Sequence, residues 1–219
     1  MEHNHPENRR RRSVWRPVAL AAVGGSVLVA MGVGVWATLT ATAANVTPEQ
    51  VTTGTLKLTM AGNGTGFAQS VANLAPGDVV NRYVDLTNGG TLDAQALTLQ
   101  VGATGVGQLV TDGTTSKALR VSVVNCVGGT WNAAAGTCGG TTTTVLAATP
   151  LSGLASAVSL ISGSVASGTV EHLQVSVQLP DQSEVTVNGA LPTGTVQGQT
   201  ANLTYTFGET QRSTATTNS

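Results

Sequence analysis

The stretch NLAPGDVVNRYVDLTNGGTLDAQALTLQV, residues 73–101, contains the pattern that decides the fold. Pro76-Gly77-Asp78 is typical of a turn, because proline fixes φ and glycine accepts positive φ. Asn88-Gly89-Gly90 marks a second turn for the same reason. Apolar residues alternate with polar ones after each turn, at Val80, Val84 and Leu86 and then at Leu97, Leu99 and Val101. A period of two predicts two β-strands that each bury one face.

The same stretch holds three acids, Asp78, Asp85 and Asp93, within sixteen positions. Asp78 and Asp93 belong to the turns, and Asp85 lies on the strand face opposite the apolar residues, where we expect it to be solvated. Calcium needs several converging oxygen ligands, and no D-x-D-x-D loop is present. We therefore expect no chemistry at these acids.

Alternation of the same period continues along the chain and predicts further strands. TTTTVLAA, residues 141–148, predicts another strand, and residues 151–161 form either a short helix or a turn-rich crossover. The other alternating runs are residues 56–60, 119–123, 173–179 and 203–207. These elements predict an all-β fold, an antiparallel two-sheet sandwich of the jelly-roll type, over residues 44–208. Residues 209–219 are polar and predict a flexible tail.

Charged residues make up 10 % of the chain and aromatic residues 3 %. Five of the ten basic residues lie between Arg9 and Arg16, and the chain beyond residue 43 carries five cations and nine anions. A nucleic-acid-binding protein needs a basic surface, so we expect no nucleic-acid partner.

The N-terminus joins a basic head, RRRRSVWR at residues 9–16, to an apolar run over residues 17–39. This pattern predicts that residues 1–43 are an export signal, with signal peptidase and the export machinery as partners. Cleavage sites are offered by Ala41-Thr42-Ala43 and by Trp36-Ala37. The run is also long enough to cross a bilayer, so a retained membrane anchor is the alternative. The general secretory route and the twin-arginine route both remain open.

Cys126 and Cys138 are the two cysteines of the chain, with eleven residues between them. In an oxidising compartment such a pair predicts a disulfide. Zinc would need about four ligands, and His172 is the sole histidine beyond the signal. Trp131 lies inside the disulfide loop, where it either packs over the bridge or is a surface contact for a partner or ligand.

Catalytic motifs are absent from the sequence: it contains neither H-E-x-x-H nor G-x-S-x-G. His172 directly follows Glu171, and neighbouring side chains of a strand point to opposite faces. The cysteines lack a partner for nucleophilic catalysis. We therefore expect no catalytic, cofactor-binding or metal-binding residues, and no enzyme.

Four features occur in a fixed order: a signal ending in VGVWATLTATA, the strand VTTGTLKLTM, the stretch of residues 73–101, and the closing NLTYTFGETQR. Together they resemble the TasA/camelysin family of secreted surface and biofilm-matrix proteins. The resemblance implies a jelly-roll domain exported through a signal-peptidase-W-type route. It also implies assembly into extracellular fibres, in which an N-terminal strand of one subunit completes a sheet of the next.

Carried over to this sequence, the donor segment is Asn45–Thr59, with Leu56, Leu58 and Met60 as candidate pocket-filling residues. Backbone hydrogen bonds would supply affinity, and alternate side chains would supply the register. The alternative is that residues 51–60 pair within their own domain.

The resulting prediction is a secreted, non-enzymatic protein of the cell surface or extracellular matrix whose main partner is itself, in a head-to-tail homopolymer. One alternative is a monomeric surface adhesion domain that its N-terminal helix retains at the membrane. The other is a secreted metalloprotease, since camelysin carries that label, although the motifs do not support it.

Overall fold

The computed structural model describes residues 52–64, 66–67, 74–105, 107–113 and 116–213. All of these except Thr52 belong to one compact unit, Thr53–Ser219. The predicted export signal lies outside the described residues, as do residues 214–219. In the part of the chain that is described, no helix has the length and apolarity needed to span a membrane.

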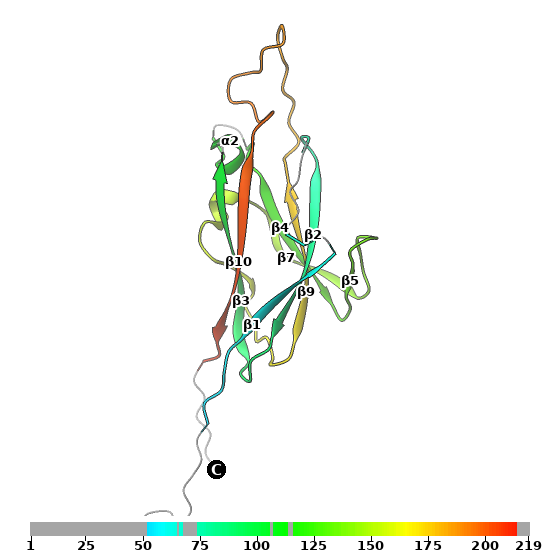
Figure 1. Ribbon diagram of the computed structural model, residues 1–219, viewed down its shortest axis with the longest axis vertical. Coiled ribbons are helices and arrows are strands. Elements are labelled where there is room, and N and C mark those ends of the chain that lie inside the picture. Colours follow the sequence, from blue (N-terminus) through cyan, green and yellow to red (C-terminus); the bar gives the residue numbers. More distant parts are fainter. Residues whose placement is uncertain (1–51, 65, 68–73, 106, 114–115, 214–219) are drawn as a thin grey trace, which may run out of the picture. The chain divides into compact units, whose positions relative to one another are not determined.

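Two antiparallel sheets form the domain (Figure 1). The five-stranded sheet has the order β1-β2-β9-β4-β7, with β1 at Leu58–Asn63, β2 at Val79–Asn88, β9 at Val170–Gln178, β4 at Arg120–Val127 and β7 at Thr141–Pro150. The three-stranded sheet has the order β10-β3-β8, with β10 at Ala201–Gln211, β3 at Ala94–Gly105 and β8 at Val158–Ile161. A small hairpin pairs β5, Trp131–Asn132, with β6, Thr137–Cys138. The short helices are α2, Gly107–Val110, and the 3-10 helix η1, Leu151–Leu154.

The chain passes from one sheet to the other between β2 and β3, β3 and β4, β7 and β8, β8 and β9, and β9 and β10. Such crossing connections between two antiparallel sheets are typical of a jelly roll. The predicted all-β sandwich is therefore confirmed, and it contains the predicted strand at TTTTVLAA as β7.

The core is aliphatic and lies between the sheets. It consists of the inward side chains that the alternation marked, including Val84 and Leu86 of β2, Leu97, Leu99 and Val101 of β3, Val121 and Val123 of β4, and Leu173 and Val175 of β9. Burying a Val or Leu side chain contributes about 1.5–3 kcal/mol, so this layer holds the two sheets together.

The turns of the opening stretch are held by side-chain hydrogen bonds. Asn88 is fully buried, donates from Nδ2 to the carbonyls of Leu92 and Val165, and accepts from the Gly90 N–H. Asp78 accepts from the Ala75 N–H at 2.8 Å, and Asp93 accepts from the Ser167 N–H at 2.9 Å. Asp78 thus holds its own turn, as its position predicted, whereas Asp93 links its loop to the distant Ser167.

Two sequence expectations are corrected by the structure. β10 continues to Gln211, so residues 209–211 belong to the sheet and the predicted tail boundary at 208 was too early. Residues 151–161 form both η1 and β8, so the segment contains a strand as well as a helical turn.

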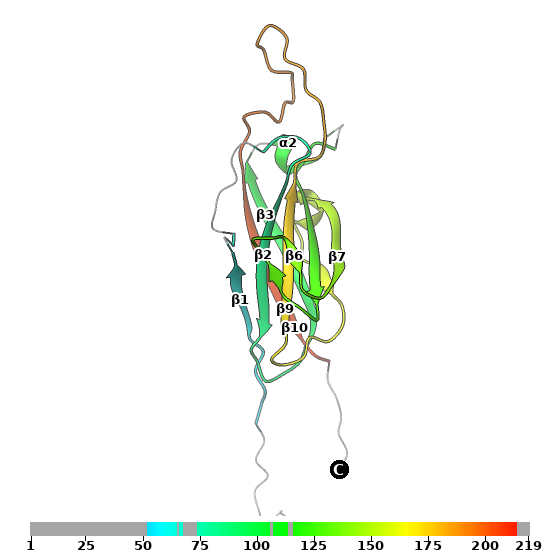
Figure 2. The ribbon, with the colours of Figure 1, turned by 90° about the vertical axis from the view of Figure 1, so that its right-hand side faces the viewer.

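The sandwich has two flanks, each made of one edge strand from each sheet. β7 and β8 contact each other and form what is here called the β7/β8 flank. The remaining edge strands, β1 and β10, form the β1/β10 flank. Phe67, which follows β1, stacks on Tyr205 of β10 across this second flank. Figure 2 shows β1 and β7 at opposite edges of their sheet.

Candidate functional site

The apolar face of β1 is incompletely covered in the β1/β10 flank. Met60 lies opposite Leu86 in the ladder, so it belongs to the row that faces the core. Leu58 packs against that core, whereas Met60 is 56 % exposed and Leu56 is 36 % exposed. Two of the three candidate donor residues therefore fill no pocket in their own chain.

Residues 58–63 pair with β2 of the same chain. In the single chain, residues 58–60 of the candidate donor region therefore pair within their own domain, which is the alternative that the sequence left open. Thr55 extends the attachment, because its N–H donates to Thr91 Oγ1 at 2.9 Å. Residues 45–51 of the candidate donor segment lie outside the described residues.

β10 is the longer strand of the flank and pairs on one side only, with β3. One row of its backbone N–H and C=O groups therefore has no strand partner in the described part of the chain, which makes it a template for a further strand. Its inward side chains Leu203, Tyr205 and Phe207 are only partly buried. The outer edge of β10 therefore presents both unpaired backbone groups and apolar side chains to an added strand.

Aromatic rings close part of this flank. The Phe67 ring stacks on Tyr205 with centroids 4.5 Å apart, and it lies 6.4 Å from the Phe207 centroid. Burial raises the pKa of Tyr205 to about 12, against an opposing effect of the nearby Arg82 charge. The phenol therefore stays neutral and the lining stays apolar at ordinary pH.

Glu209 lies at the end of the same inward row of β10, opposite Leu97 in the ladder. Its Oε2 atom is buried and has no hydrogen-bond partner among the described residues. Burial raises the pKa of its carboxyl group, because the charged form loses hydration. Glu209 Oε2 is thus a hydrogen-bond acceptor in the flank to which an N–H group of an added strand could donate.

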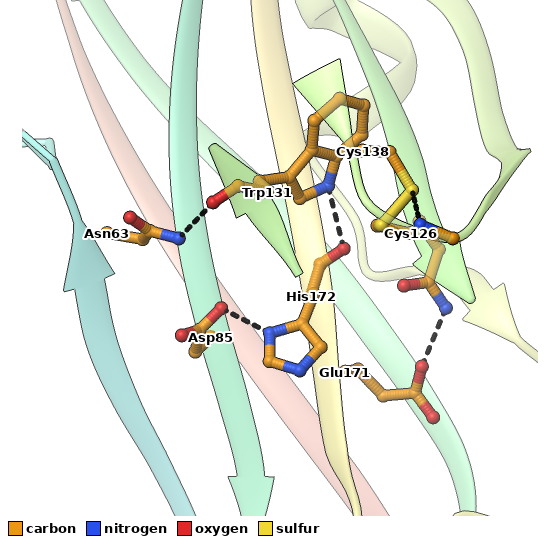
Figure 3. Close-up of a disulfide and its surroundings, with 9 residues drawn as sticks. Asn63, Asp85, Cys126, Trp131, Cys138, Glu171 and His172 are labelled. Carbon is orange, nitrogen blue, oxygen red and sulfur yellow. Dashed lines mark hydrogen bonds and ion pairs between the residues drawn. A yellow bond between two sulfur atoms is a disulfide. The ribbon is translucent and has the colours of Figure 1, made fainter. Parts of the chain in front are cut away.

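The predicted disulfide between Cys126 and Cys138 is present, and it ties the β5–β6 hairpin to β4 (Figure 3). Trp131 is only 6 % exposed, packs against Tyr83 with centroids 5.4 Å apart, and donates from Nε1 to the His172 carbonyl. Of the two expectations for Trp131, packing beside the bridge is correct and a surface contact is wrong. The ring is buried because the hairpin folds back onto the outer face of the five-stranded sheet.

The hairpin also holds the end of β1. Asn63, the last residue of that strand, donates from Nδ2 to the Trp131 carbonyl at 3.0 Å (Figure 3). The disulfide therefore stabilises a hairpin that contacts the candidate donor strand directly.

His172 and Asp85 face each other across β9 and β2, with Nδ1 and Oδ1 2.7 Å apart (Figure 3). Asp85 was expected to be solvated, and its pairing with His172 was not predicted, because the pair depends on the register between two strands that are distant in the sequence. Glu171 points to the other face, as expected, and accepts from Asn125 Nδ2 at 2.6 Å. A hydrogen-bonded His–Asp pair without a nucleophile beside it is not a catalytic triad.

Comparisons with known proteins give one family. The chain matches the family described as Peptidase_M73, camelysin metallo-endopeptidase, over residues 11–216. Curated proteins give no significant match. A solved structure described as "AvmM Catalyzes Macrocyclization in Alchivemycin A Biosynthesis" is similar at 8 % identity over 74 % of this chain and 91 % of that chain. Its TM-score of 0.30 is too low to support an argument about fold or function.

The family description implies a bound metal ion, and the described residues do not fit one. No three His, Cys, Asp or Glu side chains gather in residues 52–213 outside the gaps at 65, 68–73, 106 and 114–115. His172 is engaged by Asp85, Glu171 is engaged by Asn125, and both cysteines are in the disulfide. A catalytic zinc needs three protein ligands and an open position, and the described residues do not supply such a set.

Proposed function

Because the chain belongs to the camelysin metallo-endopeptidase family, that is, to the TasA/camelysin family that its motifs resemble, we propose that it is a non-enzymatic structural protein that assembles head to tail. Family membership supports a secreted protein of the cell surface or matrix type. In the proposed assembly, the donor segment Asn45–Thr59 and the adjoining Met60 occupy the β1/β10 flank of the next copy.

The observation that carries this proposal is the outer edge of β10, which pairs with no strand among the described residues, together with the exposed apolar row of β1. A strand added to β10 would gain backbone hydrogen bonds, and its alternate side chains would cover Leu203, Tyr205 and Phe207. Met60, which is 56 % exposed in the single chain, and Leu56, which is 36 % exposed, would both gain burial in such a complex. Full burial of an aliphatic side chain contributes about 1.5–3 kcal/mol.

The geometry of exchange favours a polymer over a closed pair. A donor segment and an acceptor edge are different surfaces, so each copy can donate to one neighbour and accept from another. Such a heterologous contact extends into a filament unless its rotation closes a ring.

Met60→Asp tests the role of the exposed row. Met60 is 56 % exposed, so the substitution should leave the free energy of unfolding within about 0.5 kcal/mol of the wild type. Fibres seen by electron microscopy should be lost, because a buried carboxylate in the acceptor flank would be unpaired. Thr59→Asp is the matched control: Thr59 is also exposed, and it points to the opposite face of β1. Equal fibre formation by both variants would refute the donor role of Met60.

The protease alternative rests on the family description. Casein zymography of the purified protein, with and without exhaustive chelation, distinguishes it. We expect no cleavage in either lane, and a band of cleavage that the chelator abolishes would overturn the non-enzymatic proposal.

A further inference from the structure

The β7/β8 flank is free of charge. Residues 121–170 contain no Asp, Glu, Lys, Arg or His, and they supply both β7 and β8 as well as the disulfide hairpin. The β1/β10 flank differs, since it carries Lys57, Glu209 and Arg212 in or beside its strands. Charged residues are the usual protection of an exposed sheet edge, and this flank has none.

β7 presents an unprotected edge on that flank. Its first four residues, Thr141–Thr144, pair regularly with Val124–Val127 of β4, and the register shifts occur further along the strand. All four threonines are exposed, and β7 is the last strand of its sheet. The segment therefore has no bulge, proline or charge that would stop another strand from pairing with its outer side.

We propose that Thr142–Thr144 of β7 pairs with the same segment of a second copy, antiparallel and about a two-fold axis at Thr143, so that Thr143 lies opposite Thr143 of the other copy. The pairing would join two five-stranded sheets into one continuous sheet. It is separate from the head-to-tail contact, because β7 and β1 lie at opposite edges of the sheet (Figure 2).

The absence of charge and the run of four threonines both indicate that the strand pairing with β7 comes from a second copy of this chain. In a two-fold contact each side chain near the axis meets its own copy, so any charge there would repel itself. A neutral flank is what such a contact requires, although the chain beyond residue 43 has more anions than cations. Four identical residues also place Thr opposite Thr, and cross-strand threonine pairs stabilise antiparallel sheets.

The introduction of a charged side chain at Thr143 tests this pairing. The full-length chain is studied in detergent by sedimentation velocity, and every variant carries Met60→Asp so that head-to-tail assembly does not contribute. We expect the Met60→Asp chain to form dimers and the added Thr143→Lys or Thr143→Glu substitution to abolish them. An equal mixture of the Lys and Glu variants should restore the dimer, since opposite charges then face each other.

Thr104→Lys is the matched control, because it adds the same charge to an exposed threonine of β3, which pairs with Asn202 of β10. It should leave the dimer unchanged. A chain that stays monomeric without any Thr143 substitution would overturn the proposal. Dimers that persist in both Thr143 variants, or a mixture that fails to restore them, would also overturn it, because the contact would not be β7 on β7.

Discussion

At the residue scale, Glu184 is the most strongly engaged acid of the described chain. It is 4 % exposed and accepts hydrogen bonds from Lys117 Nζ at 2.8 Å, from Thr195 Oγ1 and from the Val196 N–H at 3.1 Å. These bonds, led by that from Lys117, lower the pKa of Glu184 to about 2. Glu184 thus ties together two parts of the long connection between β9 and β10, and it attaches that connection to Lys117, which lies between α2 and β4.

The lowered pKa predicts an acid-dependent loss of stability. The folded pKa lies below the ordinary value of 4.5, so the stabilisation is complete above pH 4.5 and is lost as the pH falls toward 2. Glu184→Gln should lower the free energy of unfolding at pH 7 by roughly 1.5–3 kcal/mol, the range for hydrogen bonds to charged groups. Denaturant unfolding at pH 7 and at pH 3 should show a smaller difference from wild type at pH 3.

Asp181→Asn is the control for this variant, because Asp181 is exposed and lies three positions away. It should change stability little at either pH. An equal loss at pH 7 and pH 3 for Glu184→Gln would show that the carboxylate charge is not what stabilises the connection.

The residues that sequence reasoning placed well are those whose environment is set locally. Asn88 and Asp78 were identified by their turns, and their hydrogen bonds run to residues within four positions, apart from the bond of Asn88 to Val165. The Asp85–His172 pair was missed and the environment of Trp131 was left open, because their partners come from strands far away in the sequence. Alternation gives the face of a strand, but it does not give the register between strands.

At the element scale, the disulfide hairpin should stabilise the domain through the unfolded state. Replacing both cysteines with serine should cost about 3 kcal/mol in the free energy of unfolding for a loop of this length. The buried Trp131 should become more accessible to a fluorescence quencher, since the bridge holds its hairpin against the sheet. Reduction of the wild-type protein should produce the same shift. An unchanged midpoint of unfolding would show that packing of Trp131 alone holds the hairpin.

The strands themselves were largely predictable, because each one buries alternate aliphatic residues. The end of β10 was not, since Glu209, Thr210 and Gln211 are polar residues that resemble a tail. They continue the ladder because the opposing residues of β3 extend to Ala94. Residues 151–161 were ambiguous for a related reason: a short apolar run fits a helical turn and a strand equally well.

At the scale of the whole molecule, the two proposed contacts with another copy use the two different flanks of the domain. The β1/β10 flank combines a free backbone edge with an exposed apolar row, and the β7/β8 flank is neutral and threonine-rich. The sequence resemblance predicted donation by an N-terminal strand, but it could not identify the receiving edge. That edge depends on which strand ends each sheet, which is a property of the topology alone.

The most direct test of head-to-tail assembly compares two purified forms by electron microscopy. One form begins at residue 44, and the other lacks residues 44–55 and so loses most of the donor segment while keeping β1 and the acceptor edge. We predict fibres from the first form and none from the second. Fibres from the truncated form would contradict the account, and an absence of fibres from both would favour the monomeric adhesion domain.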